Sequence, residues 1–489
     1  MDHQQCEFGM IGLGVMGSNF LLNIADSGFS VVGYDKDPDK AQALNDASEG
    51  RVDGVTSVEK FVERLATPRK IMLLVPAGPI VDAVIQELSE HLEPGDVIID
   101  GGNSHYTDTD RRMEELAPKK IHFVGLGVSG GEEGARHGPS LMPGGKQEAY
   151  ETVRPMLEAA AAKVNGEPCV TYLGNKSAGH FVKMVHNGIE YAIMQLTAEV
   201  YDYLKRGMRL TNEDVQRLFA EWNEGELQSY LIEITADIFT KEDAETNDGL
   251  LVDHILDKAK QKGTGKWTSQ AAMDLGVPIP TIDVSVTMRF LSALKQQRVA
   301  AAQDLDLGSL EVEEKNLNNE EELMHALHFA FVTSYAQGLA LLQAASDEFD
   351  YGINLEDVAR IWRGGCIIRA SFLEDIMQAY REQPDLANLI LAPGIAKLMK
   401  ERHTAARHVV GLGVKQGIPV PALASALTYF DAYRTERLPS NLTQAQRDYF
   451  GAHTYERIDQ EGTFHTEWED DPEVQDKRSE EPDVKKGAN

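Results

Sequence analysis

The stretch FGMIGLGVMGSN, residues 8–19, decides the fold. It starts as an apolar run typical of a buried strand, passes through the pattern G-x-G-x-x-G from Gly12 to Gly17, and opens a helical pattern over residues 18–27. The next apolar run ends at Asp35, about 20 residues further on, as a dinucleotide-binding βαβ unit requires. A glycine-rich turn can also occur without a ligand, so it is the surrounding strand, helix and acid that favour a nucleotide site.

The glycine turn and Asp35 have distinct roles in the predicted nucleotide site. The glycines permit a tight bend and a close approach of backbone to a pyrophosphate, and the helix N-terminus supplies N–H groups and partial positive charge. A carboxylate at Asp35 accepts hydrogen bonds from a ribose 2′-hydroxyl and repels a 2′-phosphate. Lys36 could attract that phosphate, whereas Asp37 opposes it. Charge alone therefore favours NAD, and NADP stays open.

Working outward, the first 178 residues alternate apolar runs with segments long enough for helices. The runs are FGMIGLG, FSVVGYD, KIMLLVP, DVIIDGG and IHFVGLG. This pattern is typical of a parallel sheet covered on both faces. We expect an α/β Rossmann-type domain over residues 1–178 and, where a 3.6-residue period takes over, a mainly helical domain over residues 179–437.

The helical part contains two pairs of similar short segments, an internal repeat that we call the echo. LTNEDV at residues 210–215 resembles INLEDV at residues 353–358, and SYL at Ser229 recurs as SFL at Ser371. The two matches share nearly the same offset, which favours a duplicated helical unit over chance similarity between amphipathic helices.

From Leu438 the chain becomes polar, and we treat residues 438–489 as a tail. From about Glu469 it is acidic with few apolar residues, a composition that predicts disorder. The part before that carries several aromatic side chains that need a packing surface, for which another subunit is one source: Tyr449, Phe450, Tyr455, Phe464 and Trp468.

Composition excludes several classes of function. The 489 residues carry a formal net charge of −31, which argues against nucleic acid or an anionic membrane as a general partner. We find neither an 18-residue uncharged apolar run nor a secretion signal, and expect a soluble protein. The three cysteines are far apart, match no metal spacing and fit a reducing compartment such as the cytoplasm. We predict no metal site.

The stretch KMVHNGIEY, residues 183–191, places unlike chemical groups on one helix face. Lys183, His186, Asn187, Glu190 and Tyr191 fall within an arc of roughly 140°. A base and an acid held about 10 Å apart could flank the carbon chain of a small substrate. The alternative is a solvated polar face. The echo disfavours it, because the second copy of the helix has neither a lysine nor a glutamate at the matching positions.

Three other segments concentrate candidate ligand groups. The glycine-rich stretch 127–145, read as a long loop, could offer Ser129, Gly130 and Gly131 to a carboxylate or phosphate, or be only a flexible surface loop. QKGTGKW, residues 261–267, places Lys262 in a small anion-binding or simply solvated turn. Arg289 falls in an otherwise apolar helical pattern, where a buried arginine needs an anionic partner.

Five motifs in order give the chain a resemblance to a known family. They are GLGVMGSN, GVSGGEEGAR, KMVHNGIEY, KGTGKW and QRDYFGAHTYE, and the chain resembles 6-phosphogluconate dehydrogenases from about Phe8 to Trp468. The resemblance implies a Rossmann domain, a duplicated all-α domain and a C-terminal tail that reaches into the partner of a homodimer. It also implies a cytoplasmic enzyme of the pentose phosphate pathway that oxidises and decarboxylates 6-phosphogluconate.

The resemblance also implies roles for individual residues. Lys183 would be the general base and Glu190 the general acid. The substrate would be held by Asn103, Ser129, Gly130, Gly131, His186, Asn187, Tyr191, Lys262, Arg289 and, from the other subunit, Arg447 and His453. The cofactor would contact Gly12, Leu13, Gly14, Val15, Met16, Gly17, Asp35, Lys36, Asp37, Val75, Pro76, Ala77 and Asn103.

Two departures from the family pattern concern the cofactor. Members that use NADP, the commoner cofactor of the family, usually carry Asn-Arg-Thr in place of Asp35-Lys36-Asp37, and a lysine in place of Pro76. Both changes remove positive charge or hydrogen-bonding capacity and favour NAD. Two alternatives to the family function are another β-hydroxyacid dehydrogenase and a non-catalytic dinucleotide-binding protein. The basic residues Lys262, Arg289 and Arg447 argue against the first, which acts on smaller acids.

Overall fold

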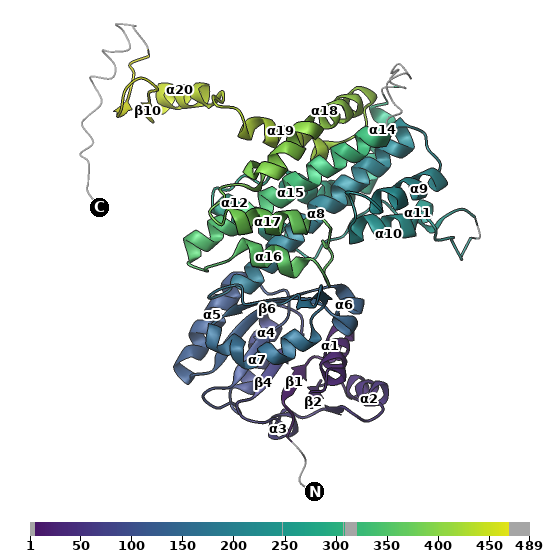
Figure 1. Ribbon diagram of the computed structural model, residues 1–489, viewed down its shortest axis with the longest axis vertical. Helices are drawn as coiled ribbons and strands as arrows, with labels where there is room; N and C mark the ends of the chain where they lie inside the picture. Colours follow the sequence, from purple (N-terminus) through teal and green to yellow (C-terminus); the bar gives the residue numbers. More distant parts are fainter. Residues whose placement is uncertain (1–4, 247, 307, 309–319, 469–489) are drawn as a thin grey trace. The chain divides into compact units, whose positions relative to one another are not determined.

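The computed structural model describes residues 5–246, 248–306, 308 and 320–468 (Figure 1). The chain divides into two compact units, Met1–Tyr429 and Phe430–Asn489. The acidic end, for which the sequence predicts disorder, lies outside the described residues.

A seven-stranded sheet forms the N-terminal part of the first unit. Its order is β3-β2-β1-β4-β5-β6-β7, and all neighbours are parallel except β6 and β7. The strands are β1 (Phe8–Ile11), β2 (Val31–Tyr34), β3 (Asp53–Val55), β4 (Lys70–Leu73), β5 (Val97–Asp100), β6 (His122–Ser129) and β7 (Ser140–Gly145). The five predicted strands are confirmed, whereas β3 and β7 were not predicted.

The glycine-rich stretch 127–145 is not the long loop that the sequence suggested. It forms the end of β6, the short helix α6 (Gly131–His137) and the antiparallel strand β7. Ser129 therefore lies at the end of a buried strand, and Gly130 and Gly131 lie at the start of α6. A Cβ on Gly130 would come within 2.6 Å of the carbonyl oxygen of Gly365, so only glycine fits this close backbone contact.

Successive side chains of each strand point to opposite faces of the sheet, so both faces are apolar and both are covered by helices. On β1, Met10 joins the hydrophobic core that contains Phe20 of α1, while Ile11 joins the core that contains Phe61 of α3. The helices are α1 (Val15–Asp26), α2 (Pro38–Ala47), α3 (Val58–Glu63), α4 (Pro79–Leu88), α5 (Tyr106–Leu116), η1 (Ala117–Lys119) and α7 (Gln147–Ala160). Two short strands, β8 (Lys163–Val164) and β9 (Glu167–Pro168), follow as a separate pair.

The remainder of the first unit is helical, with α8 and α15 packed along one another at its centre (Figure 1). The elements are α8 (Ala178–Asp202), η2 (Tyr203–Gly207), α9 (Asn212–Asn223), α10 (Tyr230–Ile238), α11 (Leu251–His254), α12 (Thr264–Asp274), α13 (Pro280–Ala293), α14 (Lys295–Asp304), α15 (Glu320–Phe349), α16 (Leu355–Trp362), α17 (Leu373–Glu382), η4 (Leu389–Leu391), α18 (Pro393–Gln416) and α19 (Pro421–Tyr433). Of the helices described, none is long and apolar enough to cross a membrane.

The structure repeats the order long helix, short helix, short helix at the two echoing segments. Thr211 and Asn354 accept backbone N–H groups at the starts of α9 and α16. Ahead of α10 and α17 the two echoing segments pair with each other: the Tyr230 N–H donates to the Arg369 carbonyl at 3.0 Å, and the Ser371 N–H donates to the Gln228 carbonyl at 2.9 Å. This reciprocal pairing is what a duplicated unit with local two-fold symmetry would give.

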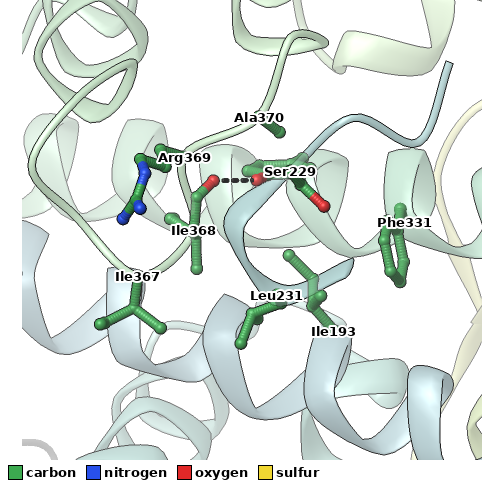
Figure 2. Close-up of a pocket in the computed structure, with 9 residues that line it drawn as sticks. Ile193, Ser229, Leu231, Phe331, Ile367, Ile368, Arg369 and Ala370 are labelled. Atoms are coloured by element: carbon green, nitrogen blue, oxygen red, sulfur yellow. Dashed lines mark hydrogen bonds between the residues drawn. The ribbon is translucent and has the colours of Figure 1, made fainter. Parts of the chain in front are cut away.

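Figure 2 shows Ser229 and Leu231 beside the segment from Ile367 to Ala370. The cavity between them measures only about 10 Å³, and its lining includes the apolar Ile193 and Phe331. That volume corresponds to about one water molecule, so this seam between the two repeats holds no substrate site.

The second unit contains α20 (Ser440–Gly451), β10 (Tyr455–Glu456) and β11 (Thr463–Phe464). Its centre is the buried carboxylate of Asp448, which accepts hydrogen bonds from the His465 ring at 2.8 Å and from the Trp468 indole N–H at 2.8 Å. Burial alone would raise the pKa of Asp448, but these hydrogen bonds outweigh it and hold the pKa at about 2. The carboxylate of Asp448 thus holds the end of the described tail, at His465 and Trp468, against α20.

A buried carboxylate on α8 holds α19 in place. Both oxygens of Glu199 accept from the backbone N–H of Ala422, at 2.8 and 3.1 Å, and one accepts from that of Leu423 at 2.9 Å. These N–H groups lie in the first turn of α19, where no carbonyl of the helix can reach them. The same helix α8 carries Lys183, and α19 leads into the tail.

We expect Glu199→Ala to lower the thermal unfolding midpoint by about 5 °C or more, because two buried N–H groups lose their acceptor. Glu199→Gln should cost less, since one oxygen remains, and the exposed Glu233→Ala serves as control. Burial raises the pKa of Glu199 from 4.5 to about 7. Its stabilising contribution therefore falls as pH rises from 4.5 to about 7, a dependence that the Gln variant should lack. Equal midpoints for Glu199→Ala and Glu233→Ala would contradict this anchoring role.

Candidate active site

The glycine turn after β1 has the geometry that the motif predicts. Gly12 has a φ of 94°, and a Cβ there would lie 2.5 Å from the carbonyl oxygen of Leu74. A Cβ on Gly17 would lie 1.9 Å from the carbonyl oxygen of Gly12, which explains the third glycine. A Cβ on Gly14 would meet nothing within 4 Å, so open space remains where the backbone at the N-terminus of α1 can approach a ligand.

A cavity of about 630 Å³ opens beside this turn, at the carboxyl ends of β1, β2 and β4. Six of the predicted cofactor residues line it: Gly12, Gly14, Asp35, Lys36, Val75 and Pro76. The others, Leu13, Val15, Met16, Gly17, Asp37, Ala77 and Asn103, are not in its lining. The volume suits part of a dinucleotide, and the place is where parallel sheets of this type bind ligands.

Lys183 on α8 is buried, with 6% of its surface exposed. Its side chain fits because β6 passes at backbone distance: a Cβ on Gly127 would lie 2.5 Å from the Lys183 Cβ. Burial lowers the pKa of Lys183 from its ordinary value, and the nearby Glu190 only partly opposes this shift. The solvated-face alternative is therefore wrong, and the amine has the environment of a usable base.

A hydrogen-bond chain fixes the groups next to Lys183. The His186 Nδ1 lies 3.0 Å from the Asn187 Oδ1, and the His186 Nε2 lies 3.2 Å from the Ser129 Oγ. Because an amide oxygen only accepts, this network assigns the ring proton to Nδ1 and makes Nε2 an acceptor from Ser129. Burial, with Lys183 as a second cause, lowers the pKa of His186 well below its usual value, so the ring stays neutral.

The other end of this chain reaches α12. The Asn187 Nδ2 donates to the Thr264 Oγ1 at 3.1 Å. Thr264 was missed as a site residue, and the only signal for it was its place inside the KGTGKW motif. It couples α8 to the turn that carries Lys262.

Glu190 lies toward the other end of the same helix face. Its side chain is 20% exposed, and one of its oxygens lies 3.9 Å from the His186 Nδ1. Burial raises the pKa of Glu190, against the opposing charges of Lys183 and Arg289. Both shifts favour neutral forms, an amine that can take a proton and a carboxylic acid that can give one.

Arg289 on α13 differs from its prediction. It is half-buried, and its partners are not anions: its guanidinium lies 3.8 Å from the centre of the Tyr191 ring, and it donates to the carbonyl oxygen of Lys260 at 2.8 Å. The Tyr191 ring in turn packs on Gly265, where a Cβ would lie 2.5 Å from it. Stacking and the carbonyl bond satisfy the guanidinium in place of an anionic partner.

The structure thus links Ser129, Lys183, Asn187 and Glu190 through His186, with Gly130 and Gly131 following Ser129. Tyr191, next to Glu190 in the chain, forms a separate pair with Arg289. Lys262 is exposed two residues before Thr264, and Asn103 is exposed after β5. Arg447 on α20 and His453 just after it belong to the second compact unit, where both side chains are exposed.

Comparison with known proteins adds independent findings. Residues 7–174 match the model of the NAD binding domain of 6-phosphogluconate dehydrogenase, and residues 179–468 match the model of its C-terminal domain. The chain is 55% identical to the NADP(+)-dependent, decarboxylating 6-phosphogluconate dehydrogenase of Bacillus subtilis over 96% of this chain and all of that protein. It is 51% identical to the decarboxylating enzyme of Escherichia coli, with the same coverage.

A solved structure agrees. The 6-phosphogluconate dehydrogenase of Plasmodium falciparum, described in its apo form and in complexes with NADP+ and with 6-phosphogluconate, superimposes with a TM-score of 0.92 at 43% identity. The likeness covers 95% of this chain and all of that one.

A sheet with a glycine-rich turn, joined to a helix that carries a buried base and a partly buried acid, defines an oxidoreductase that works with a nicotinamide dinucleotide. The matches are more specific than the class: the chain belongs to the 6-phosphogluconate dehydrogenase family. The resemblance drawn from the five motifs is confirmed, as are the predicted fold class and the prediction of a decarboxylating dehydrogenase.

Proposed function

We propose that this chain converts 6-phosphogluconate to ribulose 5-phosphate and CO₂ while reducing a nicotinamide dinucleotide, as a step of the pentose phosphate pathway in the cytoplasm. The observation that carries the proposal is the pair on one face of α8, the buried Lys183 and the partly buried Glu190, with pKa shifts toward a neutral amine and a neutral acid. The names of the relatives from Bacillus subtilis and Escherichia coli support the substrate.

The chemistry requires one base and one acid acting in turn. The dinucleotide, when bound, accepts the hydride from C3 of the substrate. Lys183 takes the proton of the 3-hydroxyl during that oxidation, which a buried neutral amine can do. The resulting β-keto acid loses CO₂ while the protonated Lys183 stabilises the oxygen on which charge gathers. Glu190 then protonates C1 of the enediol, as a carboxyl with a raised pKa can.

The remaining site residues would position the substrate. Asn103, Ser129, Gly130, Gly131, His186 and Asn187 would hold the sugar acid. Tyr191, Lys262 and Arg289 would bind the phosphate end together with Arg447 and His453 of the tail. The stacking of Arg289 on Tyr191 supports this assignment, because it fixes a planar guanidinium that also bonds the carbonyl of Lys260, two residues before the exposed Lys262.

We further propose a homodimer in which residues 438–489 act as an exchanged tail, after a dinucleotide-binding domain of residues 1–178 and a helical domain of residues 179–437. Apolar side chains that are exposed in the single chain support a partner surface: on α13 and α14, Phe290, Leu291, Leu294 and Val299 are each 43–47% exposed. In the tail, Phe450 is 74% exposed. Groups of exposed apolar residues mark association surfaces.

A direct assay tests the function. Purified protein with 6-phosphogluconate and either dinucleotide should yield CO₂ and a ketose phosphate in equal amounts to the reduced cofactor. The smaller acid 3-hydroxyisobutyrate should give no comparable rate, which separates this activity from that of another β-hydroxyacid dehydrogenase. Binding of a dinucleotide without release of CO₂ would instead favour a non-catalytic nucleotide-binding protein.

A further inference from the structure

The corner of the 630 Å³ cavity at the end of β2 is lined by the charged residues Asp35, Lys36 and Lys40. Asp35 lies in this corner with its carboxylate fixed at both oxygens: Oδ2 accepts from the Leu13 N–H at 2.9 Å, and Oδ1 accepts from the Asp37 N–H at 3.0 Å. The side chain is 13% exposed. A carboxylate has about four lone-pair sites, so it keeps acceptor capacity for ribose hydroxyls, yet it cannot swing away from a second anion.

The lysines of this corner are already paired with carboxylates. The Lys36 Nζ lies 2.8 Å from Glu87, and the Lys40 Nζ lies 3.6 Å from Asp35 and 4.0 Å from Asp37. Three carboxylates therefore face two ammonium groups. No arginine lines this cavity among the residues that the structure describes.

The part of the lining that follows β4 and begins α4 offers no compensating charge either. It consists of apolar side chains, among them Val75, Pro76 and Ile80. A 2′-phosphate placed in this corner would bring close to two further negative charges beside a fixed carboxylate. It would have to break an existing ion pair to gain a cation, whereas a 2′-hydroxyl needs only the acceptor that Asp35 provides.

We propose that this chain selects NAD over NADP, with Asp35 as the specificity-determining residue and Glu87 as the group that withholds Lys36. The expected preference in kcat/KM rests on the proposed function. A preference for NAD sets this chain apart from its Bacillus subtilis relative, whose name states dependence on NADP(+).

Two measurements on the full-length protein test it. In the first, calorimetry compares 5′-AMP with 2′,5′-ADP, two adenosine fragments that differ only in the 2′-phosphate and need no substrate. In the second, initial rates with 6-phosphogluconate give kcat/KM for NAD and for NADP. We expect a preference of about tenfold or more for the fragment and the dinucleotide without the 2′-phosphate.

Single substitutions test which side chain causes the preference for a ligand without the 2′-phosphate. Asp35→Asn should weaken binding of 5′-AMP, strengthen binding of 2′,5′-ADP, and shift the kcat/KM ratio about tenfold toward NADP. Glu87→Gln leaves the glycine turn and Asp35 intact and frees Lys36, so it should strengthen only 2′,5′-ADP binding. Asp46→Asn, elsewhere on α2 and outside the cavity lining, should change neither.

The outcomes separate the two proposals. Equal or better use of NADP by the unaltered protein overturns the NAD preference and leaves the proposed function in place. Fragment selectivity without turnover of 6-phosphogluconate sustains the preference and overturns the function. Failure of both fragments to bind, or unchanged selectivity in both variants, overturns the inference.

Discussion

Replacing Lys183 with methionine should reduce kcat by about 10²–10⁴-fold, the usual contribution of a general base. Methionine keeps an unbranched apolar stem of similar size in the space between α8 and β6 but cannot accept a proton. Affinity for the dinucleotide should stay unchanged, because Lys183 is not in the lining of the cavity beside the glycine turn. Stopped-flow rates and calorimetry on the same preparation measure the two quantities.

Lys183→Met should also change how the thermal unfolding midpoint depends on pH. Burial lowers the pKa of Lys183 below its ordinary 10.5, so folding disfavours the ammonium form. The unfolded chain binds this proton more tightly than the folded one, and the wild type gains stability as pH rises through the depressed pKa toward 10.5. Lys183→Met lacks this gain. Its thermal midpoint should exceed that of the wild type most at pH values below the depressed pKa, and the difference should shrink as pH rises toward 10.5.

A matched control is Lys397→Met on α18, whose side chain is 78% exposed. It should alter neither turnover nor the pH dependence of the midpoint. Turnover of Lys183→Met within a few-fold of the wild type would remove Lys183 from the mechanism, and with it the reading of α8 as the catalytic helix.

The sequence could predict the helix that carries the proposed catalytic residues but not why its polar residues avoid water. The spacing of Lys183, His186 and Glu190 follows from helical geometry alone. Their burial depends on β6, where Gly127 permits the approach, and on α12, where Thr264 meets Asn187. Such contacts join segments that lie far apart in the chain, and no local period records them.

The errors in the predicted sheet have a similar cause. The strand β7 carries Pro143 and ends in two glycines, residues that normally mark loops, so SLMPGG reads as part of a turn. It pairs antiparallel with β6 over six residue pairs, and only that long-range pairing makes it a strand. The three-residue β3 is too short and too exposed to show an apolar run.

Electrostatic partners were predicted less well than residue positions. The motif placed Asp35 at the end of β2, as observed, but it did not reveal that Lys40 approaches Asp35 or that Glu87 holds Lys36. For Arg289 the sequence gave an apolar pattern and an expected anion, whereas the structure supplies an aromatic ring and a carbonyl. Side-chain charge is visible in a sequence, but its compensation is a property of the folded chain.

Replacing Arg447 with alanine should raise KM for 6-phosphogluconate about 10- to 100-fold and change kcat much less. A charge-assisted hydrogen bond to a phosphate contributes about 1.5–3 kcal/mol, and the phosphate end does not take part in the reaction, so the loss falls on binding. Arg457→Ala is the matched control, since this tail arginine pairs with Asp459 at 2.7 Å and has no proposed contact with substrate. Removal of the chain from Gln444 onward should raise KM further, because His453 is lost as well.

Mixing Lys183→Met with Arg447→Ala then decides which subunit supplies the tail, provided that 6-phosphogluconate is kept well below the raised KM of Arg447→Ala. If Arg447 of the partner subunit completes each site, a heterodimer of Lys183→Met and Arg447→Ala contains one site with both functional residues. Random exchange of subunits should therefore restore about one quarter of the sites to wild-type KM and kcat. If each tail serves its own subunit, no site in the mixture holds both residues, and activity stays at the level of the separate variants. Absence of restoration under conditions that demonstrably exchange subunits would refute the exchanged tail while leaving the roles of Lys183 and Arg447 intact.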